Sequence, residues 1–521
     1  MTKISKKYTL YYDIITLIIC IGGMVLSRFV INVGLSLLII RIIFISPWKE
    51  KLERIKENKY ILLVFISFFF LNAISLLWTN NLNFGLNEIG RRVSLIIVPI
   101  ALAIISPLSR KEMKILFISY ISIIFLATLW GAMQLLLDPF ADNRKLIAST
   151  SHIRFSLNLV FSILIILNLT FTYRKTIKKN YKILLYSIAL WFLIYLFLTQ
   201  AITGILILMF FGIIYIPYYL LKNKKTIKSL LILSIYVISL SLFILWIVKE
   251  KNNYFTPNEI YSQKIVEKTK YGGVYSNTNN PPLIENGNYI NMYYCRDEVF
   301  LSWKERTNLS PYEYEGAIIR YLNSISPYKD KEHFDKLTDE DIKNIKNNIA
   351  NKEYTRSFSL KPRLYQLFFQ INSYQVEGKV KGFSELQRLE LWINAEKLIE
   401  DNPLLGTGIG DFDSLFCNKL KERNSQLYGS MLKTHNQYLY IASTFGIFGL
   451  IFFIFWLLYP PIKKGVFFSF KYFAFFFISI ASFLTEDTLL TLAGMMFYIF
   501  ICSIFVFNKD ALNINSPLFK K

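Results

Sequence analysis

The sequence predicts an all-α polytopic membrane protein with about 12 transmembrane helices, and three observations lead to this class. Hydrophobic residues make up 53% of the chain and aromatic residues 17%. The mean hydropathy is +0.37, and soluble domains seldom combine such values. The third observation is a series of apolar runs close to the ~20 residues that a helix needs to cross a bilayer.

The apolar runs define the expected spans in chain order. The first run lacks a small-residue cleavage site, so we expect it to stay in the membrane as an anchor. We expect spans at residues 9–27, 29–47, 60–78, 93–106, 114–137, 155–173, 183–199, 203–221, 229–248, 436–459, 466–485 and 489–507.

The distribution of basic residues predicts the orientation of these spans. The chain carries 59 Lys and Arg against 36 Asp and Glu, a formal net charge of +23. In a soluble protein this excess would suggest a nucleic-acid partner. With a cytoplasmic N-terminus, 25 basic residues fall in cytoplasmic segments and 6 in the short outer loops. Because basic residues favour cytoplasmic loops, we expect both termini in the cytoplasm and no nucleic acid as a partner.

One outer segment is long enough to form a domain of its own. Two stretches, "LTDEDIKNIKNNIA" and "PRLYQLFFQINSY", predict helices, the first capped by Thr338, and "NTNNPPLIENGN" (277–288) predicts loop. The expected organisation is therefore nine transmembrane helices in 1–248, a mostly helical outer domain in 249–434, and three more helices with a cytoplasmic tail in 435–521.

The cysteines carry little functional information. Cys20 and Cys502 lie in apolar runs, and none of the four cysteines shows metal-ligand spacing. Cys295 and Cys417 can pair if the outer compartment is oxidising, and the sequence leaves this open.

A histidine marks the outer end of the tenth span. His435, one of three histidines in the chain, stands at the head of "KTHNQYLYIASTFG". Gly446 follows about three helical turns later, so a continuous helix would put both residues on one face with Tyr438 and Ala442. Small residues there would let a neighbouring helix or a lipid chain approach closely. The plainer alternative is a histidine that only contacts water and headgroups.

A helix with an arginine in its early turns precedes this histidine. In "SELQRLELWINAEKLIED", Ser384 and Gln387 match a capping box, which predicts a helix start. Arg388 follows, with Trp392 one turn on. The alternative for Arg388 is a surface salt bridge with Glu385.

The glycines of "GTGIGD" (406–411) come directly after that helix. A glycine-rich backbone can form a nest of N–H groups for phosphate. Such a stretch is more often a plain turn, so the motif carries little weight alone.

Further cations are expected at the same level of the membrane. "TSHIRFSLNL" places His152 and Arg154 at the outer mouth of the sixth span, and Arg91 and Arg92 precede the fourth. An arginine in such a position ordinarily extends to the headgroups. Because several arginines gather on a face that the charge rule leaves poor in them, we expect an anionic ligand, and phosphate suits arginine geometry.

Taken in order, these motifs resemble the O-antigen ligase and O-antigen polymerase superfamily, and its Bacteroidetes-type members in particular. The similarity rests on the arginine helix with "QRLELW", on "NPLLGTGIGDF", and on His435 with Gly446 eleven residues later. "HIRFSL", "LTDEDI" and "LTEDTLLTLAG" (484–494) add to it. The resemblance covers most of the chain and is strongest from 384 to 495.

The resemblance implies a GT-C-like glycosyltransferase of the bacterial inner membrane, with its large loop domain in the periplasm. Such enzymes take a glycan from undecaprenyl diphosphate, and the ligases transfer it to lipid A–core without a metal or another cofactor. Arg388 would match the family's loop arginine and His435 its histidine as catalytic residues. The expected substrate-binding residues are Arg154, His152, Arg91, Arg92 and Tyr438.

One motif departs from the family pattern. Many members carry a basic residue between Ser and Thr-Gly at the start of a span, where this chain reads "TQAITG" (199–204) with Ile202 in that place. Arg154 is the candidate replacement, with Arg91 or Arg92 behind it.

The expected chemistry needs cations and a proton acceptor. A glycosyl diphosphate already has a good leaving group, so the protein mainly supplies positive charge to the diphosphate. A neutral histidine can accept or orient the proton of an acceptor hydroxyl. The carboxylates of "DFD" (411–413) are weak metal candidates, and Glu486 and Asp487 form a short outer turn that can line the site.

Two rival interpretations stay open at this stage. Polymerisation of O-units and transfer of a glycan to a protein hydroxyl use the same donor, and the sequence does not separate them from ligation. A transporter or flippase would need ionisable residues within spans and matching halves. Asp13, Arg41 and Lys471 are the few candidates for such residues, and the two halves of the chain show no similarity.

Overall fold

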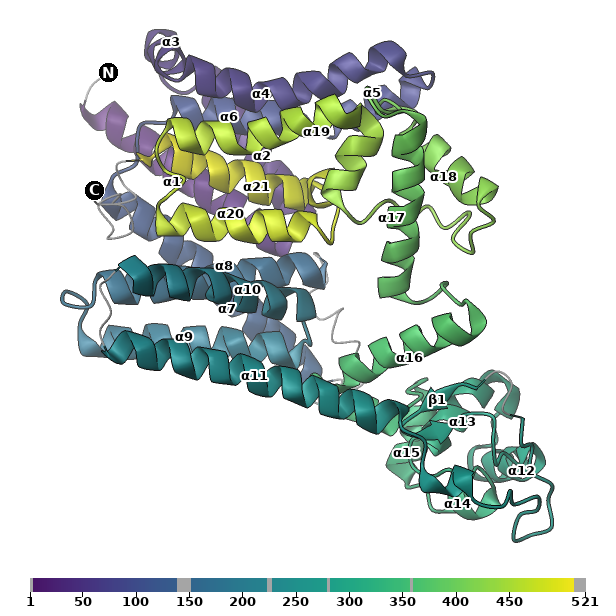
Figure 1. The fold of residues 1–521 in the computed structure, drawn as a ribbon. Coiled ribbons are helices and arrows are strands. Elements are labelled where there is room, and N and C mark those ends of the chain that lie inside the picture. The colour runs from purple at the N-terminus through teal and green to yellow at the C-terminus, as the bar shows by residue number, and fades with distance from the viewer. Residues whose placement is uncertain (1–2, 138–150, 223–226, 279–281, 357–358, 510–521) are drawn as a thin grey trace. The chain divides into compact units, whose positions relative to one another are not determined.

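The computed structural model describes residues 3–137, 151–222, 227–278, 282–356 and 359–509. Helices dominate it (Figure 1). The chain divides into two compact units: the first comprises Met1–Lys222 and Arg388–Lys521, and the second Asn223–Gln387.

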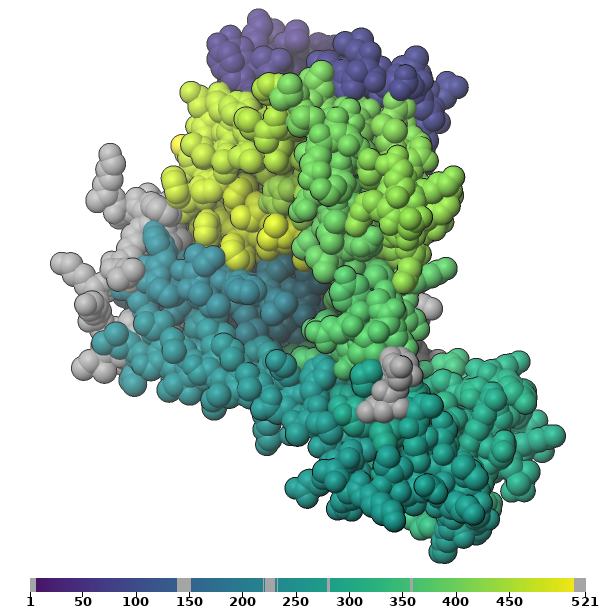
Figure 2. All heavy atoms as spheres, turned by 45° about the vertical axis from the view of Figure 1, so that its right-hand side comes forward, coloured from purple at the N-terminus to yellow at the C-terminus, as the bar shows by residue number. Residues whose placement is uncertain are grey.

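The first unit is a bundle of helices that joins the two ends of the sequence. In Figure 2 the purple N-terminal segments lie directly against the yellow-green C-terminal ones. Its helices are α1 (Lys3–Leu26), α2 (Arg28–Ile43), α3 (Trp48–Glu57), α4 (Lys59–Ile74), α5 (Leu82–Gly90), α6 (Ser94–Ile104), α7 (Arg110–Leu137), α8 (His152–Thr172), α9 (Lys179–Leu198), α10 (Ile202–Lys222), α17 (Ser384–Asp401, whose first residues fall in the second unit), α18 (Phe412–Glu422), α19 (Gln437–Lys463), α20 (Phe470–Phe483) and α21 (Leu492–Phe507), with short 3₁₀ turns η1 (Ser75–Trp78) and η5 (Thr488–Leu490).

Every expected span coincides with a helix, but fewer helices meet the length of a full crossing. Within the described residues, 7 helices are long and apolar enough, and 8 if α2 and α3, bent by 105°, count as one span. Three more apolar stretches are shorter: Ile202–Tyr218, Phe470–Phe483 and Leu492–Phe507. Helix α6 has 11 residues, well short of the ~20 of a straight crossing. Length and composition therefore support seven or eight spans and do not confirm twelve.

Two of the charged residues inside the apolar segments neutralise each other. Asp13 on α1 and Arg41 on α2 form an ion pair at 2.6 Å, and both side chains are 2% exposed. Arg41 also donates to the carbonyl of Ile45 at 2.7 Å. Because each charge is matched within the bundle, the pair joins α1 to α2 and gives no support to an ion path.

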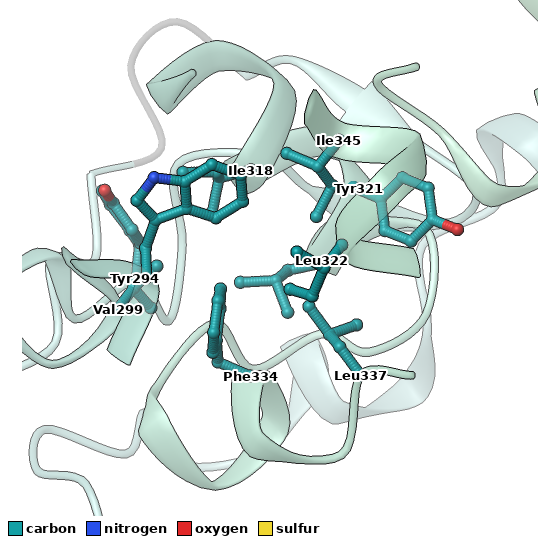
Figure 3. Close-up of a cluster of buried hydrophobic side chains, with 10 residues drawn as sticks. Tyr294, Val299, Ile318, Tyr321, Leu322, Phe334, Leu337 and Ile345 are labelled. Carbon is teal, nitrogen blue, oxygen red and sulfur yellow. The ribbon is translucent and has the colours of Figure 1, made fainter. Parts of the chain in front are cut away.

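The second unit has its own hydrophobic core. Figure 3 shows the side chains of Val299, Ile318, Leu322, Phe334 and Ile345 packed together. The unit's elements are α11 (Ile227–Phe255), η2 (Glu259–Ser262), β1 (Ile284–Glu285), β2 (Asn288–Tyr289), α12 (Arg296–Thr307), η3 (Pro311–Glu313), α13 (Glu315–Asn323), α14 (Lys331–Asp335), α15 (Asp339–Lys346), η4 (Lys352–Thr355) and α16 (Lys361–Glu377).

Local predictions for this unit are mostly confirmed. Thr338 caps α15 in a capping box with Asp341, because the threonine side chain accepts from the Asp341 N–H and the aspartate accepts from the Thr338 N–H. The stretch "PRLYQLFFQINSY" lies in α16. The expected loop at 277–288 is wrong in part, since its end contains β1 and the start of β2, paired antiparallel; residues 279–281 lie outside the described residues.

The compact units and the expected domains have different boundaries. Hydropathy placed the outer domain at 249–434, whereas contacts group residues 223–387. Hydropathy marks where the chain becomes polar, but residues 388–434 pack with the bundle: the carboxylate of Asp411 accepts from the N–H groups of Asn80 and Asn81 at 2.7 and 2.9 Å. All four cysteines, Cys295 and Cys417 among them, are free thiols.

Candidate active site

His435 lies just before α19 and has an uncommon backbone conformation. Its φ is 48°, in the left-handed region that non-glycine residues seldom adopt. Asn436 is the N-cap of α19, and its side chain accepts from the N–H groups of Tyr438 and Leu439. The expectation that His435 begins a helical stripe is therefore wrong: the helix starts after it, and the imidazole projects from the capping turn.

The carboxylate of Asp487 holds this turn in place. It accepts from the Thr434 hydroxyl at 2.5 Å and from the N–H groups of His435 and Asn436 at 2.8 and 3.0 Å. The three donors are adjacent along the chain, so one buried side chain fixes the backbone on both sides of the histidine. Burial raises the pKa of Asp487, although these donors and the nearby imidazole partly oppose the rise.

Glu486 bridges the two residues that the sequence predicts as catalytic. Arg388 Nη2 lies 3.2 Å from one carboxylate oxygen and His435 Nδ1 lies 3.9 Å from the other. The first contact is a charge-assisted hydrogen bond, and the second is an ion contact too long for one. Arg388 is thus paired with Glu486, 98 residues away in sequence.

The charges around Glu486 affect its pKa. Burial alone would raise the pKa of this carboxyl group, but its interaction with His435 and the positive charges of Arg388 and Arg154 hold the pKa below its ordinary value. Glu486 is 10% exposed and His435 33% exposed, so the carboxylate is largely buried while the imidazole is partly open to solvent. Arg154, on the first turn of α8, therefore acts on the same carboxylate as Arg388.

Several buried donors on the two arginines and on a neighbouring tryptophan have no acceptor in the part of the chain that the structure describes. Arg388 Nε, Arg154 Nε and Trp392 Nε1 are buried without a hydrogen-bond partner in the described part of the chain. Trp392 lies four residues after Arg388 and so shares its face of α17. Buried N–H groups are ordinarily paired, so donors left free on two elements are suited to an anion with several oxygen atoms.

Arg154 also lies near the position of the family's missing basic residue. A Cβ atom at Gly204, in "TQAITG", would lie 2.8 Å from the Cβ atom of Ser156, so the start of α10 packs tightly on the start of α8. The carbonyl of Arg154 accepts from Asn158 Nδ2 at 2.9 Å, which fixes this turn of α8. The structure thus places Arg154 two residues from the contact with the segment that contains Ile202.

The glycine-rich stretch is a structural joint. The N–H groups of Thr407 and Gly408 donate to the carbonyls of Ser443 and Thr444, both at 2.9 Å. Those of Ile409 and Gly410 donate to side chains of the segment around η1 at 3.2 and 3.3 Å. The weaker of the two sequence interpretations, a phosphate nest, is therefore excluded for these four N–H groups, because they donate within the protein.

The same joint explains Gly446. Its φ and ψ are 66° and −168°, which break α19, and a Cβ atom there would lie 2.0 Å from the carbonyl oxygen of Leu404. The glycine admits the backbone of the preceding loop into the gap. The predicted continuous helical face from His435 to Gly446 is accordingly wrong.

The remaining predicted binding residues lie elsewhere or have other partners. Arg92 is buried and donates to the carbonyl of Glu88 and to the hydroxyl of Tyr440, both at 3.0 Å, beside a small cavity. Arg91 is 72% exposed and pairs with Glu88 at 2.5 Å. Tyr438 donates to the carbonyl of Ile480 at 3.2 Å.

Of the predicted set, the structure therefore brings together Arg388, His435 and Arg154. His152 opens α8, two residues before Arg154, and is half-buried. Sequence reasoning named Glu486 and Asp487 as residues that can line the site, without a role for either, and did not identify Trp392 as a donor. The signal for the acidic pair was its place in an outer turn between two spans.

The metal candidates of the sequence have structural partners. Asp411 accepts from Asn80 and Asn81, and Asp413 pairs with Lys433 at 3.0 Å. Among the described residues, no group of three or more His, Cys, Asp or Glu is gathered as metal ligands would be.

Comparison with known proteins gives one match. Residues 338–454 match the family model described as O-Antigen ligase, a range that includes Arg388, Trp392, His435 and Gly446. No curated protein matches the chain. The match supports the resemblance to the O-antigen ligase superfamily over these residues, and it stops short of Glu486 and Asp487.

Proposed function

We propose that this chain, whose residues 338–454 match the O-Antigen ligase family model, transfers a glycan from undecaprenyl diphosphate to a hydroxyl of lipid A–core on the periplasmic face of the inner membrane. The observation that carries the proposal is the cluster around Glu486. It combines a partly exposed histidine with two arginines whose Nε groups lack acceptors among the described residues. Cations for a leaving diphosphate and a base for an attacking hydroxyl are the groups that this reaction needs.

The arginines would hold the donor. A diphosphate offers several oxygen atoms to the free N–H groups of Arg388, Arg154 and Trp392. Its charge would replace Glu486 as the partner of Arg388, and charge stabilisation would grow as the bond to the sugar breaks. The polyprenyl tail would remain in lipid beside the apolar helices.

His435 would serve the acceptor. Its Nδ1 faces Glu486, which leaves Nε2 for the acceptor hydroxyl. As the acceptor oxygen bonds to the anomeric carbon, its proton passes to Nε2 and undecaprenyl diphosphate leaves from the opposite side. The configuration of the anomeric carbon would be inverted, and Glu486 would stabilise the imidazolium.

O-antigen polymerase and protein O-glycosylation ligase are the alternatives, because they need the same donor and differ only in the acceptor. Purified protein would be given undecaprenyl-diphosphate glycan with lipid A–core, a serine- and threonine-containing peptide, or a second lipid-linked unit. We expect transfer to lipid A–core. Transfer to one of the other acceptors alone would replace the ligase assignment by the corresponding alternative.

The catalytic assignment has a matched histidine control. We expect His435→Ala to lower the transfer rate by at least ~100-fold, the usual contribution of a general base. His333→Ala removes a histidine of the second unit and should leave the rate within about twofold. Normal transfer by the His435 variant would overturn the proposed role of this residue.

A further inference from the structure

Lys471 is a buried cation at the other end of α20 from Glu486. It is the second residue of the helix, which Ser469 caps by accepting from the Tyr472 N–H at 3.4 Å. The side chain is 9% exposed, and its Nζ lies 5.4 Å from the ring centroid of Phe117 on α7. Among the described residues, Lys471 has no hydrogen bond or ion pair with an oxygen atom.

The other two lysines that are buried in the described residues, Lys51 and Lys329, have hydrogen-bond acceptors. Lys51 Nζ donates to the carbonyls of Ile42 and Ile43 at 2.7 and 3.1 Å, where it caps the end of α2. Lys329 Nζ donates to three oxygen atoms of the second unit at 2.9, 3.0 and 3.2 Å. An ammonium group has three donors, and burying it without an anion or acceptors is costly. The face of Phe117 meets only part of this cost.

Extension to the headgroups does not explain Lys471. A lysine that extends along the outside of a bundle exposes its stem to lipid or water. This side chain is instead enclosed by protein. An anion that reaches the ammonium group from the helix end would complete it, as intramembrane charges are ordinarily completed by a partner.

The surroundings of Lys471 favour an anion. The N–H groups at the first two positions of α20 have no acceptor within the helix, and the helix dipole adds positive potential there. Lys114 lies three residues before Phe117 on α7, so it shares the face that Lys471 contacts, and it is exposed at the rim. Arg110 and Lys111, also exposed, begin the same helix.

We propose that Lys471 binds the phosphate of an anionic phospholipid, with Lys114 at the rim of the site. The start of α20 belongs to the end of the bundle that the charge distribution assigns to the cytoplasm, where anionic headgroups lie. A phosphate at that level would accept from the ammonium group and from the free N–H groups of the helix end. In Figure 1, α20 lies between α21 and α8, so such a lipid would contact the C-terminal helices as well as the early ones. This site is independent of the glycan-transfer reaction.

Lipid titration of the full-length protein tests the proposal. Native mass spectrometry in detergent would compare phosphatidylglycerol with phosphatidylcholine for wild type, Lys471→Met and Lys463→Met. Lys463 is an exposed lysine at the end of α19, so its variant loses the same charge outside the site. We expect wild type to prefer phosphatidylglycerol, Lys471→Met to bind it about tenfold more weakly, and Lys463→Met to bind it within about twofold of wild type.

Two further arms keep the result decisive. Lys471→Arg retains the charge and should retain the preference; if Lys471→Met does not fold, this variant and wild type still report on the site. Equal binding of the two lipids by wild type, or equal phosphatidylglycerol binding by wild type and Lys471→Met, would overturn the proposal. Inorganic phosphate that displaces phosphatidylglycerol at millimolar concentration would assign the site to free phosphate instead of a lipid.

Discussion

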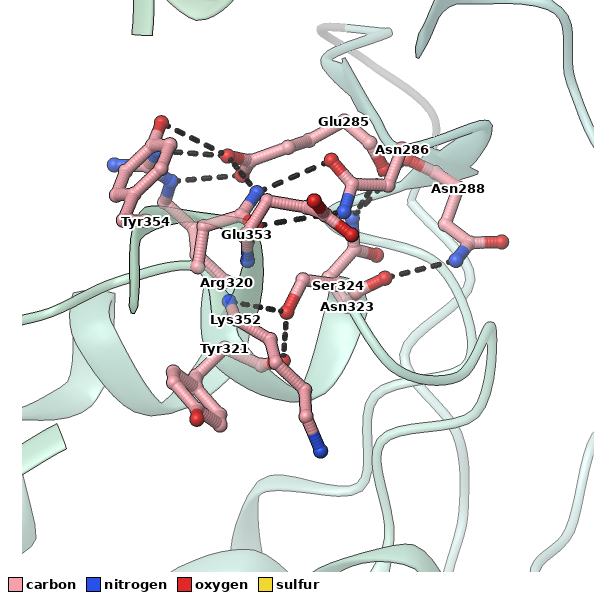
Figure 4. A network of polar contacts seen from close by, with 11 residues as sticks. Glu285, Asn286, Asn288, Arg320, Tyr321, Asn323, Ser324, Lys352, Glu353 and Tyr354 are labelled. Carbon is pink, nitrogen blue, oxygen red and sulfur yellow. Dashed lines mark hydrogen bonds and ion pairs between the residues drawn. The ribbon is translucent and has the colours of Figure 1, made fainter. Parts of the chain in front are cut away.

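Two buried carboxylates of this chain are each paired with an arginine, yet they are completed to different degrees. In the second unit, Arg320 donates to both oxygens of Glu285 at 2.8 Å (Figure 4). Asn351 donates to one of these oxygens at 2.7 Å. In the first unit, Arg388 reaches only one oxygen of Glu486, at 3.2 Å. The Arg388 Nε group has no acceptor at all within the described chain.

This difference separates a structural network from a binding site. Glu285 is fully buried, and Arg320 also stacks on the ring of Phe369, so this guanidinium is enclosed by polar and aromatic partners. A completed polar network fixes one arrangement of the chain. An incomplete one keeps donors for a ligand at a cost in stability, which is usual at functional sites.

The largest expected effect is the loss of transfer in Arg388→Ala. Removing a donor that stabilises a leaving group costs about 100-fold to 1,000-fold in rate. The unfolding temperature should change little, because the arginine is only partly satisfied in the free protein. Transfer assays and thermal unfolding in detergent would measure the two quantities. A large loss of stability with normal transfer would show that the Arg388–Glu486 pair is structural and not a binding site.

Arg320→Ala should show the opposite pattern. It would leave Glu285 buried without its counter-ion, which costs about 3 kcal/mol of folding free energy. Hydrogen exchange of α13 and β1 should accelerate, while the transfer rate per folded molecule changes little. Unaltered exchange in this variant would show that the network is not the structural element we describe.

Arg154→Gln should have a smaller effect on donor binding. One fewer charge on the diphosphate should raise KM for the lipid-linked donor about tenfold and lower kcat less. The neutral amide of Gln keeps a hydrogen-bonding group at the same turn of α8. A variant with unchanged KM would remove Arg154 from the donor site and leave Arg388 as its main cation.

The smallest expected effect concerns pH and the second unit. Burial by itself would raise the pKa of the Asp330 carboxyl group. Hydrogen bonds from His333 and Tyr275 outweigh burial and lower this pKa to about 2. A carboxyl group with a depressed pKa stabilises the fold above its unfolded pKa, and this contribution is lost as pH falls toward 2. Asp330→Asn should therefore cost about 1 kcal/mol at neutral pH, allowing for solvent screening, and the variant and wild type should converge near pH 2. Unfolding temperatures measured across this range would check the convergence, and a constant difference would contradict it.

Motif order predicted part of the site, and spatial contact supplied the rest. Arg388 and His435 could be named from the sequence because each stands in a recognisable local pattern. Their common contact with Glu486 could not be predicted, since Glu486 lies 98 residues after Arg388 and nothing local links the two. Arg91 and Arg92 show the opposite case, in which a local pattern predicts binding residues that have other partners. Both form ion pairs with Glu88, which lies three and four residues before them.

The fold was predictable to a similar extent. Hydropathy located the helices well because apolar runs must fold into hydrogen-bonded segments in lipid. It assumed a continuous α19, and it could not anticipate that Leu404 approaches Gly446 closely enough to break the helix. Hydropathy also placed the outer domain's end at 434, where the chain becomes apolar again, whereas contacts group residues 388–434 with the bundle.

The break at Gly446 affects how loss-of-function screens of this protein should be interpreted. A methyl group there would collide with the Leu404 carbonyl and would be strained at a φ of 66°. The short helical segment before the break anchors the turn that presents the imidazole, so the collision would displace the histidine without touching any substrate. Gly446 would therefore be recovered among inactive variants, and only a measurement of donor affinity would distinguish a misplaced catalytic group from a missing one.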